Sequence, residues 1–280
     1  MTDSRGIVLI TGCSSGFGLE IAVHLAKHGY TVVATMRNLA KRGDLDSASQ
    51  KARVSLDVLQ LDVTDDASVR SAVRAVVSKH SRIDALINNA GYGVLGNIEE
   101  TTLAEWKAQF ETNVFGLVRV TQAVLPVMRS QRSGKIVHIG SIGGRLSAPY
   151  MGVYHSTKHA LEAINEAMRH EIAMFDIQCT LIEPGGSPTK FVGAMALPKA
   201  MTDPASPYAA QNAHILALRE KMRHFGFKPE EVARTVARAL ASRRMRRRYV
   251  VGADAKLYAF IRNFVPDGWW DPVVRKMYLG

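Results

Sequence analysis

Residues 6–18 read Gly6-Ile7-Val8-Leu9-Ile10-Thr11-Gly12-Cys13-Ser14-Ser15-Gly16-Phe17-Gly18. The β-branched apolar run at the start is typical of a buried strand, and it leads directly into a turn with the glycine spacing G-x3-G-x-G. An amphipathic stretch, 19–28, follows and ends at Gly29, which favours a helix stop. A strand, a glycine turn and a helix N-terminus together offer backbone N–H groups to a pyrophosphate. A plain β–α connection is the alternative, but we expect a dinucleotide to be bound by Gly12, Ser14, Ser15, Gly16, Phe17 and Gly18.

Strand and helix patterns alternate along the rest of the chain. The strands are predicted near 7–11, 31–36, 57–61, 83–87, 135–140, 177–183 and 248–251. The helices are predicted near 17–28, 65–79, 102–130, 152–174, 205–224 and 229–241, whereas residues 38–55 are polar and ambiguous. This alternation predicts one α/β domain over residues 1–280, with a doubly wound, Rossmann-like parallel sheet of about seven strands and helices on both faces.

The composition is that of an ordinary globular protein, with 47% hydrophobic and 22% charged residues. No apolar run reaches the roughly 18 residues that a membrane-spanning helix needs. Residues 1–5 lead directly into the first strand, so we expect no signal peptide. Cys13 and Cys179 are expected to be free thiols in a reducing compartment, which favours a cytoplasmic location. No Cys/His spacing suggests a metal site.

A tyrosine and a lysine four residues apart predict a proton-transfer site. On a helix, Tyr154 and Lys158 share one face, so the ammonium group can approach the phenol. A nearby positive charge favours the phenolate, so we expect Lys158 to lower the pKa of Tyr154 from about 10. Taken alone, the pair also fits a surface helix with a solvated lysine. His155 lies between the two in sequence but points off their face.

Five motifs follow one another in a fixed order. The glycine turn precedes Asn88-Asn89-Ala90-Gly91, then Asn113, then Ser141, and finally the Tyr154/Lys158 pair, with intervals of 28 residues (113 to 141) and 13 residues (141 to 154). This order resembles the short-chain dehydrogenase/reductase family. Pro184-Gly185, with Thr189 beyond it, resembles the PGxxxT segment of that family. The glycine turn, the strand at 33–37 and Gly140–Gly144 are similar to the branch that contains 17β-hydroxysteroid and retinol dehydrogenases and many bacterial relatives.

The resemblance implies a role for each motif residue. Tyr154 would be the general acid for ketone reduction and the general base for alcohol oxidation, and Ser141 would donate a hydrogen bond to the substrate oxygen. Lys158 would also hold the nicotinamide ribose, and Asn113 would hold a water in a proton relay. Further cofactor contacts are implied at Asp62, Val63, Asn89, Ala90, Gly91, Tyr154, Lys158, Pro184, Gly185 and Thr189.

The end of the second predicted strand bears on the choice of cofactor. An acidic residue at this point usually binds the ribose hydroxyls of NAD, but this chain has Met36 and then Arg37. A guanidinium group can form charge-assisted bonds to a 2′-phosphate, which a carboxylate would repel. NADP(H) is therefore expected in preference to NAD(H), with a merely solvated Arg37 as the alternative.

The segment at about 190–225 resembles the substrate lid of the family and is rich in apolar residues. It favours a bulky, apolar carbonyl or alcohol as substrate, although the same residues can simply pack the lid onto the body. We therefore predict an NADP(H)-dependent oxidoreductase. The alternative is a catalytically inactive NADP(H)-binding sensor or scaffold, which would not need Ser141 or Tyr154. The sequence leaves the physiological substrate, the direction and the stereochemistry open.

The chain carries a net charge of +11, and its densest basic run is Arg243-Arg244-Met245-Arg246-Arg247-Arg248. No aromatic residues are interleaved with the arginines, so we expect a solvated loop before the last strand rather than a nucleic-acid site. The helices at 102–130 and 152–174 resemble those that the family uses for subunit contacts, so a homodimer or homotetramer is expected. Trp269 and Trp270 are expected to pack on the chain's own core.

Overall fold

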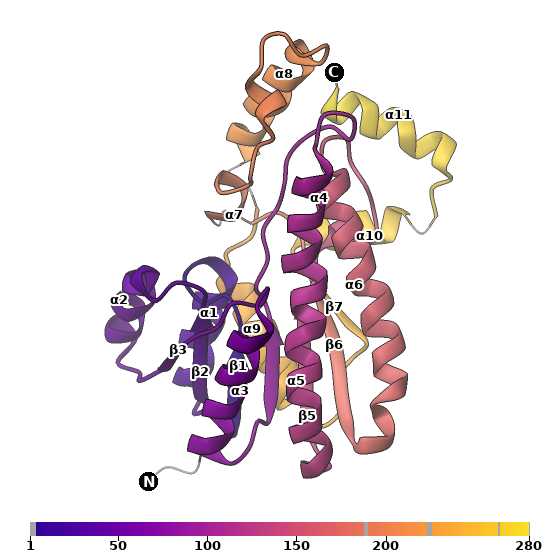
Figure 1. The fold of residues 1–280 in the computed structure, drawn as a ribbon. Coiled ribbons are helices and arrows are strands. Elements are labelled where there is room, and N and C mark those ends of the chain that lie inside the picture. Colours follow the sequence, from indigo (N-terminus) through magenta and orange to yellow (C-terminus); the bar gives the residue numbers. More distant parts are fainter. Residues whose placement is uncertain (1–3, 188–189, 223–225, 263, 280) are drawn as a thin grey trace.

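A single parallel sheet organises the molecule (Figure 1). The computed structural model describes residues 4–187, 190–222, 226–262 and 264–279. Within them, seven strands lie in the order β3-β2-β1-β4-β5-β6-β7, and every neighbouring pair is parallel. The predicted doubly wound sheet is confirmed. Its strands are β1 (Ile7–Ile10), β2 (Thr31–Met36), β3 (Asp57–Gln60), β4 (Ala85–Asn88), β5 (Gly134–Ile139), β6 (Ile177–Pro184) and β7 (Arg248–Val251).

Helices cover both faces of this sheet because successive side chains of a strand point to opposite sides. Val8 and Ile10 of β1 belong to one hydrophobic cluster, whereas Ile7 and Leu9 belong to another. On one side α1 packs against α9, and on the other α3 packs against α5. The covering helices are α1 (Gly16–Lys27), α2 (Gly43–Ala52), α3 (Asp66–His80), α4 (Leu103–Phe110), α5 (Gly116–Gln131), α6 (Gly152–Glu171) and α9 (Glu230–Ala241).

The direction in which strands are added reverses at the centre of the sheet. The strand β1 pairs with β2 on one side and with β4 on the other. At such a switch point the loops that follow the two strands separate, and a crevice opens beyond their carboxyl ends. The glycine turn follows β1 and the Asn89-Ala90-Gly91 segment follows β4, so the fold places both beside this crevice.

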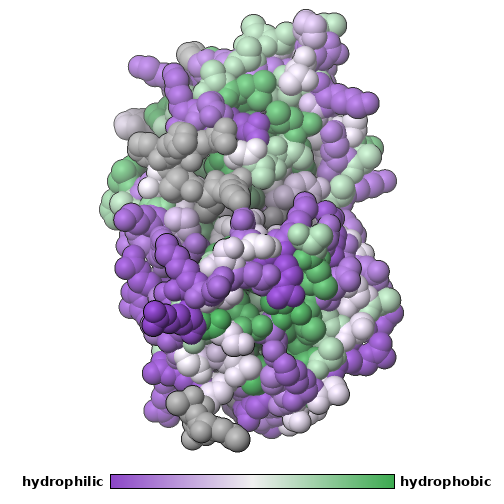
Figure 2. Space-filling view, turned by 90° about the vertical axis from the view of Figure 1, so that its left-hand side faces the viewer, coloured by the Kyte–Doolittle hydropathy of each residue, from purple (hydrophilic) through white to green (hydrophobic). Residues whose placement is uncertain are grey.

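A second layer of short elements rises above the carboxyl ends of the strands (Figure 1). It contains α7 (Lys190–Gly193), a 3₁₀ turn (Lys199–Thr202) and α8 (Ala209–Met222), and it corresponds to the predicted lid. The segment is joined to the β4–α4 loop, because Leu95 N donates to Ala196 O at 3.0 Å and Ala196 N donates to Gly93 O at 2.9 Å. In Figure 2, apolar side chains reach the surface in this upper part as well as in the body below.

Three local features differ from the predicted pattern. The ambiguous stretch 38–55 folds as a 3₁₀ turn (Leu39–Lys41) followed by α2. The long helix predicted over 102–130 is interrupted by a π-helical turn at Glu111–Phe115. Two C-terminal helices, α10 (Ala253–Arg262) and α11 (Asp267–Tyr278), were not predicted. Pro266, Gly268 and Pro272 obscure the periodicity of α11. None of the helices in the described ranges is both long and apolar enough to span a bilayer.

Candidate active site

The glycine turn brings the backbone that follows β1 close to the backbone that follows β4. Gly12 has φ +74°, and a Cβ atom there would lie 2.8 Å from the Cα of Ala90. A Cβ on Gly18 would collide with the carbonyl oxygen of Gly12 and with the Asn89 amide. Around Gly16 (φ +59°) the space is open to 4 Å, and the N-cap of α1, Ser15, makes no side-chain cap hydrogen bond. The first N–H groups of α1 are therefore not capped by Ser15, and a pyrophosphate can approach the turn at Gly16.

Asn89 braces this turn from the neighbouring strand. Its side-chain amide donates to Thr11 O at 2.9 Å and to Gly12 O at 3.0 Å. The Thr11 hydroxyl in turn accepts hydrogen bonds from the backbone N–H groups of Asn89 and Ala90, both at 3.0 Å. Both amide protons of Asn89 are thus committed to the turn, so the predicted contact with the nicotinamide ribose has only its oxygen available.

Ser141 and Tyr154 meet beyond the carboxyl end of β5. Ser141 begins a short 3₁₀ turn (Ile142–Gly144), and its hydroxyl accepts a hydrogen bond from Gly143 N at 3.1 Å. Tyr154 lies in the first turn of α6 with only 8% of its surface exposed. Burial raises the pKa of Tyr154 to about 12, and a hydrogen bond with Ser141 only partly opposes this. The expected lowering of this pKa by Lys158 is therefore not what the structure gives.

Lys158 approaches the tyrosine but is held by the backbone. Its Nζ lies 5.6 Å from the centre of the Tyr154 ring and donates to the carbonyl oxygen of Ile139 at 2.9 Å. Burial lowers the pKa of Lys158 to about 8. Behind it lies His138, a fully buried residue of β5 whose pKa is lowered to about 3 by burial and by the charge of Lys158. His138 is therefore neutral at physiological pH and adds no charge beside the lysine.

The π-helical turn positions Asn113. One extra residue in a helical turn changes the direction of the side chains that follow, and such turns often occur at functional sites. The Asn113 amide donates to Tyr92 O at 2.8 Å and to the Thr157 hydroxyl at 3.2 Å, and its oxygen accepts from Tyr92 N at 3.0 Å. Asn113 thereby links the β4–α4 loop to α6 at Thr157, the residue that precedes Lys158.

Arg37 and Asp62, two of the predicted cofactor contacts, follow β2 and β3. The Arg37 side chain is exposed. Burial raises the pKa of Tyr92, and the positive charge of Arg37 partly opposes this rise. One oxygen of the Asp62 carboxylate accepts from Thr64 N at 3.0 Å and from the Thr64 hydroxyl at 2.8 Å. Val63 is buried against Gly116. Arg37, Asp62 and Val63 all lie just beyond the carboxyl ends of β2 and β3, where the cofactor is predicted to bind.

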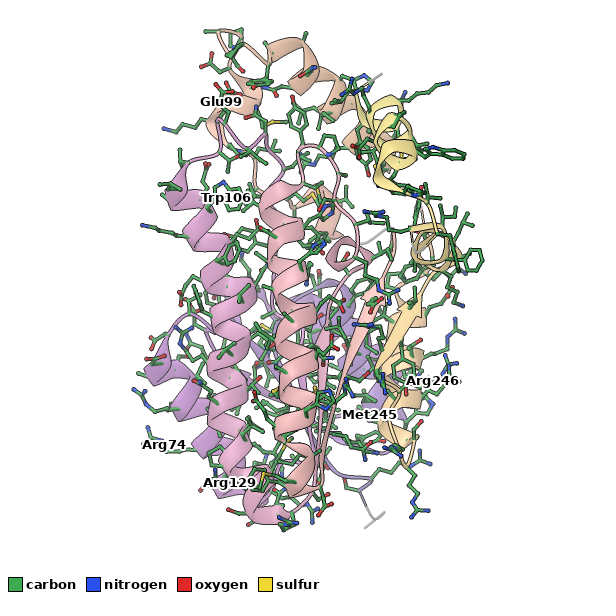
Figure 3. The ribbon with its side chains drawn as sticks, turned by 90° about the vertical axis from the view of Figure 1, so that its right-hand side faces the viewer. Arg74, Glu99, Trp106, Arg129, Met245 and Arg246 are labelled. Carbon is green, nitrogen blue, oxygen red and sulfur yellow. The ribbon has the colours of Figure 1, made fainter. Side chains whose placement is uncertain are left out.

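A buried charge cluster, which the sequence did not reveal, lies beneath the catalytic candidates. Glu183 of β6 is fully buried, and its two carboxylate oxygens lie 3.3 Å from Arg145 Nε and 3.0 Å from Arg248 Nε. Arg248 also pairs with Glu162, one helical turn beyond Lys158, at 2.9 Å. Arg248 is thus no solvated loop residue, in contrast to the expectation for 243–248, whereas Arg246 at the β7 edge is exposed (Figure 3). Nothing in the spacing of single charges signals such a cluster.

Burial, with a smaller contribution from the neighbouring Glu162, raises the pKa of Glu183 to about 7, although Arg145 and Arg248 oppose the rise. The cluster joins the carboxyl end of β6 and the first residue of β7 to α6 and to the turn after Ser141. Pro184 and Gly185, which follow Glu183 directly, lie at the carboxyl end of β6 as predicted, and Gly185 N donates to Val251 O at 2.9 Å. Thr189, the last predicted cofactor residue, lies outside the described residues.

The lid closes over the tyrosine. The Phe191 ring in α7 lies 5.4 Å from the Tyr154 ring, and Gly93 lies against Phe191 and Met195. Arg219 of α8 donates to the carbonyl oxygens of Val192 and Gly193, at 2.9 and 2.6 Å, and so fixes the C-terminal end of α7. His155, by contrast, points away from this space, since its ring accepts from Ala148 N at 3.1 Å.

The chain is similar in sequence to retinol and hydroxysteroid dehydrogenases. Retinol dehydrogenase 8 of Bos taurus is 38% identical over 259 residues, which cover 89% of this chain and 82% of that protein. Human 17-beta-hydroxysteroid dehydrogenase type 1 is 35% identical over 255 residues, 88% of this chain and 77% of that protein. The predicted likeness to the hydroxysteroid and retinol dehydrogenase branch is thereby confirmed.

Solved structures with this fold agree over the whole length. A short-chain dehydrogenase from Streptomyces avermitilis has a TM-score of 0.77 at 32% identity, covering 98% of this chain and 99% of that one. A Burkholderia phymatum short-chain dehydrogenase/reductase in complex with NAD has a TM-score of 0.78 at 26% identity, covering 92% of each chain. Actinorhodin polyketide ketoreductase with NADPH has a TM-score of 0.75 at 27% identity, covering 90% of this chain and 97% of that one.

The family model for short chain dehydrogenase matches residues 6–198, which hold the glycine turn, Asn113, Ser141, Tyr154 and Lys158. This range begins just before β1 and ends in the segment above the strands, whereas Arg219 and Arg248 lie beyond it. Its relatives with bound nucleotides include complexes of both NAD and NADPH. The chain therefore belongs to the short-chain dehydrogenase/reductase family and is an oxidoreductase of the kind that uses a nicotinamide dinucleotide.

Proposed function

We propose that this chain is an NADP(H)-dependent oxidoreductase that interconverts a bulky, apolar carbonyl compound and its secondary alcohol. The observation that carries the proposal is the convergence of the Ser141 hydroxyl, the Tyr154 phenol and the Lys158 ammonium group beyond β5. A protein that only binds a nucleotide has no use for this arrangement. The reaction direction follows from cellular concentrations and is not part of the proposal.

In the reductive direction, the Tyr154 phenol donates its proton to the carbonyl oxygen, and Ser141 donates a hydrogen bond to the same oxygen. When bound, NADPH supplies the hydride that the carbonyl carbon accepts. The raised pKa of Tyr154 keeps the phenol protonated at neutral pH, as a proton donor requires. Lys158, fixed by Ile139 O, then places its positive charge beside the phenolate that remains.

Asn113 completes the proposed proton path. Both of its amide protons are used by Tyr92 O and Thr157, so a relay water between solvent and Lys158 would bond to the second lone pair of its oxygen. The same contacts hold the π-helical turn against α6. The nicotinamide ribose would lie against Lys158, and the pyrophosphate against Gly16 and the N-terminus of α1.

The preference for NADP(H) rests on Arg37. The guanidinium group is exposed at the end of β2, and no acidic side chain takes that position in the chain. In Arg37→Asp, the ratio of the affinities for NADPH and NADH should fall by roughly 10- to 100-fold, because a carboxylate repels the 2′-phosphate. Binding of the two nucleotides is measured by fluorescence titration. Arg74→Asp, a matched change on the exposed face of α3 (Figure 3), should leave the ratio unchanged.

The substrate class is proposed from the lid. Phe191 faces Tyr154, and Met195 and Leu197 pack in the cluster that Met201 and Ile215 form, so the walls above the phenol are apolar. NADPH oxidation should therefore be faster with bulky apolar ketones and aldehydes than with small polar ones. Tight nucleotide binding with no turnover of any compound in such a panel would favour the sensor or scaffold instead.

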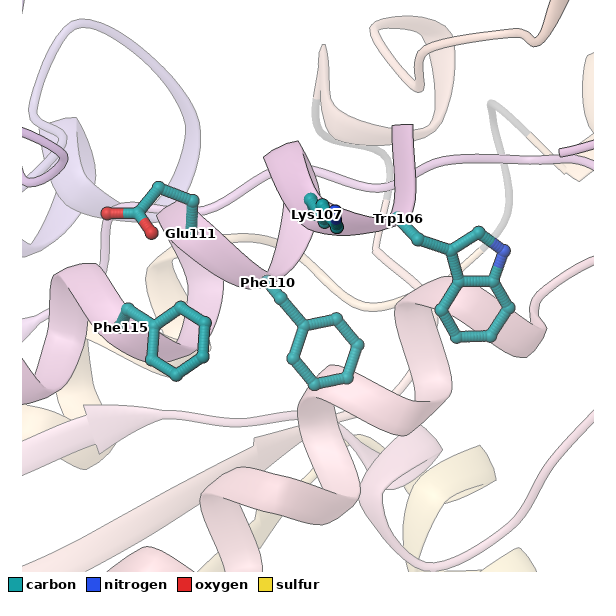
Figure 4. Close-up of a pocket in the computed structure, with 5 residues that line it drawn as sticks. All are labelled: Trp106, Lys107, Phe110, Glu111 and Phe115. Atoms are coloured by element: carbon teal, nitrogen blue, oxygen red, sulfur yellow. The ribbon is translucent and has the colours of Figure 1, made fainter. Parts of the chain in front are cut away.

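A second copy of the chain is the proposed partner of the outer face of α4 and the π-helical turn. Trp106, Phe110 and Phe115 line a shallow hollow there, with Lys107 and Glu111 at its sides (Figure 4). Phe115 is 53% exposed in the single chain, and a hydrophobic hollow of this kind is typical of a subunit contact. In Figure 3, α4–α5 and α6 run side by side on the same face, which fits the predicted homodimer or homotetramer.

A further inference from the structure

Exposed apolar side chains are concentrated on the last two helices. Of the twelve large hydrophobic side chains that are exposed in the described part of the chain, six lie between residues 257 and 277. Their positions follow helical spacing, at i, i+3 and i+7 along α10 and just beyond it, and at i, i+4 and i+8 along α11. They are Leu257 (57% exposed), Phe260 (65%), Phe264 (71%), Trp269 (77%), Val273 (50%) and Met277 (46%).

These two rows of exposed side chains lie on other faces than those that pack α10 and α11 against the rest of the chain. Trp270 packs edge-on against Tyr258, with ring centres 6.4 Å apart, and Ala255 and Ala259 are buried. Trp270 is thus partly packed on the chain, as predicted, but Trp269 is not. An ordinary surface helix has one apolar face, and it is directed at the core. A second, outward apolar face on both helices indicates a further contact.

Basic side chains accompany the outward face. Lys276 follows Trp269 by seven residues and so shares its side of α11, and Lys256 is adjacent to Leu257 on α10. Asp271 and Arg275 are four residues apart on the other side of α11, where their charges offset each other. Asp254 turns to the body and accepts from Gly186 N at 2.7 Å. The outward face is therefore aromatic and basic, within a chain of net charge +11.

We propose that α10 and α11 form a docking surface for an anionic lipid bilayer, on which the protein lies without crossing it. The four residues Leu257, Phe260, Phe264 and Trp269 would enter the boundary between headgroups and acyl chains, and Lys256 and Lys276 would contact lipid phosphates. Aromatic and apolar residues on one face with lysines beside them are characteristic of helices that bind at this depth. Figure 3 places the two helices at the edge of the molecule remote from α4 and α5, so a dimer through the latter leaves them accessible.

The docking surface is continuous with the substrate lid. Tyr278 and Leu279, at the end of α11, pack in the hydrophobic cluster formed by Leu95, Met201 and Ile215. A protein docked through α10 and α11 therefore holds its lid beside the bilayer, where apolar carbonyls and alcohols accumulate. The surface itself is inferred from exposure and charge alone, so it does not depend on the proposed reaction.

Sedimentation with lipid vesicles tests this proposal on the intact protein. We expect binding to vesicles of phosphatidylcholine and phosphatidylglycerol in a roughly three-to-one ratio, and much weaker binding to phosphatidylcholine alone or at high salt. Phe260→Gln/Trp269→Gln should lower the partition coefficient at least about tenfold, because two large side chains lose their burial in lipid. Lys256→Glu/Lys276→Glu should remove the preference for the anionic vesicles.

The matched control is Ile98→Gln/Met174→Gln, which removes two side chains, each 69% exposed, from segments outside α4, α10 and α11. It should bind vesicles like the unmodified protein. Equal loss in the control, or no binding of the unmodified protein to either vesicle, would overturn the proposal. Light scattering separates one further outcome: if Phe260→Gln/Trp269→Gln lowers the mass of the assembly, the surface is a contact between copies and the proposal is wrong.

Discussion

Tyr154 is held in surroundings that favour its protonated form. It is buried, it bonds to Ser141, and the nearest cation, Lys158, is anchored to a backbone oxygen rather than to the phenol. Tyr154→Phe removes the proton donor but keeps the ring that packs against Phe191. Turnover should fall by about 10²- to 10⁴-fold, while NADPH binding and the melting temperature stay near those of the unmodified protein. Steady-state kinetics with a titration of NADPH checks this, and activity close to normal would rule out the assigned role.

Glu183 carries a second prediction at the same scale. Its pKa is about 7 in the folded protein and near 4.5 when exposed, so the folded state holds more protons between these values. The free energy of unfolding should therefore decrease as the pH rises through this window, by a total on the order of 3 kcal/mol. In Glu183→Gln this decrease should largely disappear in urea unfolding at pH 5 and pH 8. Glu171→Gln, on the exposed end of α6, is the control that should keep it.

At the scale of elements, the strand–turn–helix unit at the N-terminus is the proposed nucleotide site. Gly18→Ala introduces a methyl group against Gly12 O and the Asn89 amide, two groups that hold the turn. We expect a loss of about 1–3 kcal/mol in unfolding free energy and a large loss of NADPH affinity. Gly43→Ala, in α2, has open space around the new atom and should be neutral or slightly stabilising. Thermal unfolding and nucleotide titration of both variants provide the comparison, and equal behaviour of the two would contradict the close-packed turn.

The elements also show which parts of the molecule the sequence predicts. The strands were found because they are short β-branched runs next to glycine, and the last one, 248–251, was predicted with its observed bounds. Asn113, Ser141, Tyr154 and Lys158 were predicted from their order and intervals along the chain, and their catalytic roles stay a prediction. The π-helical turn and the Glu183 cluster were missed because both depend on contacts between segments that are far apart in the sequence. The turn contacts the β4–α4 loop and α6, and the cluster joins β6, β7 and α6. The pKa of Tyr154 was predicted in the wrong direction because burial, which outweighs a neighbouring charge, is a tertiary property.

At the scale of the whole molecule, the face of α4 and the π-helical turn is expected to hold two copies together. Phe115→Glu replaces an apolar wall of the hollow, beside Trp106 and Phe110, with a charge that a partner would have to desolvate. The mass measured by size-exclusion chromatography with light scattering should then fall to that of the single chain, 30.7 kDa. Phe260→Glu, at a still more exposed aromatic residue on α10, should not change the mass. If the unmodified protein already has the mass of a single chain, this prediction is wrong.

The brace between Thr11 and Asn89 has a consequence for how the protein matures. It joins residues 78 positions apart, and β1 acquires β4 as a neighbour only after β2, β3 and the helices between them have been made. Long-range parallel pairing of this kind forms slowly. A nascent chain that ends before β4 thus carries the complete glycine sequence without the shape that binds phosphate. Nucleotide binding should therefore appear late on the folding pathway. By mass action, dinucleotide in the cell then stabilises those chains in which β1 and β4 have paired correctly.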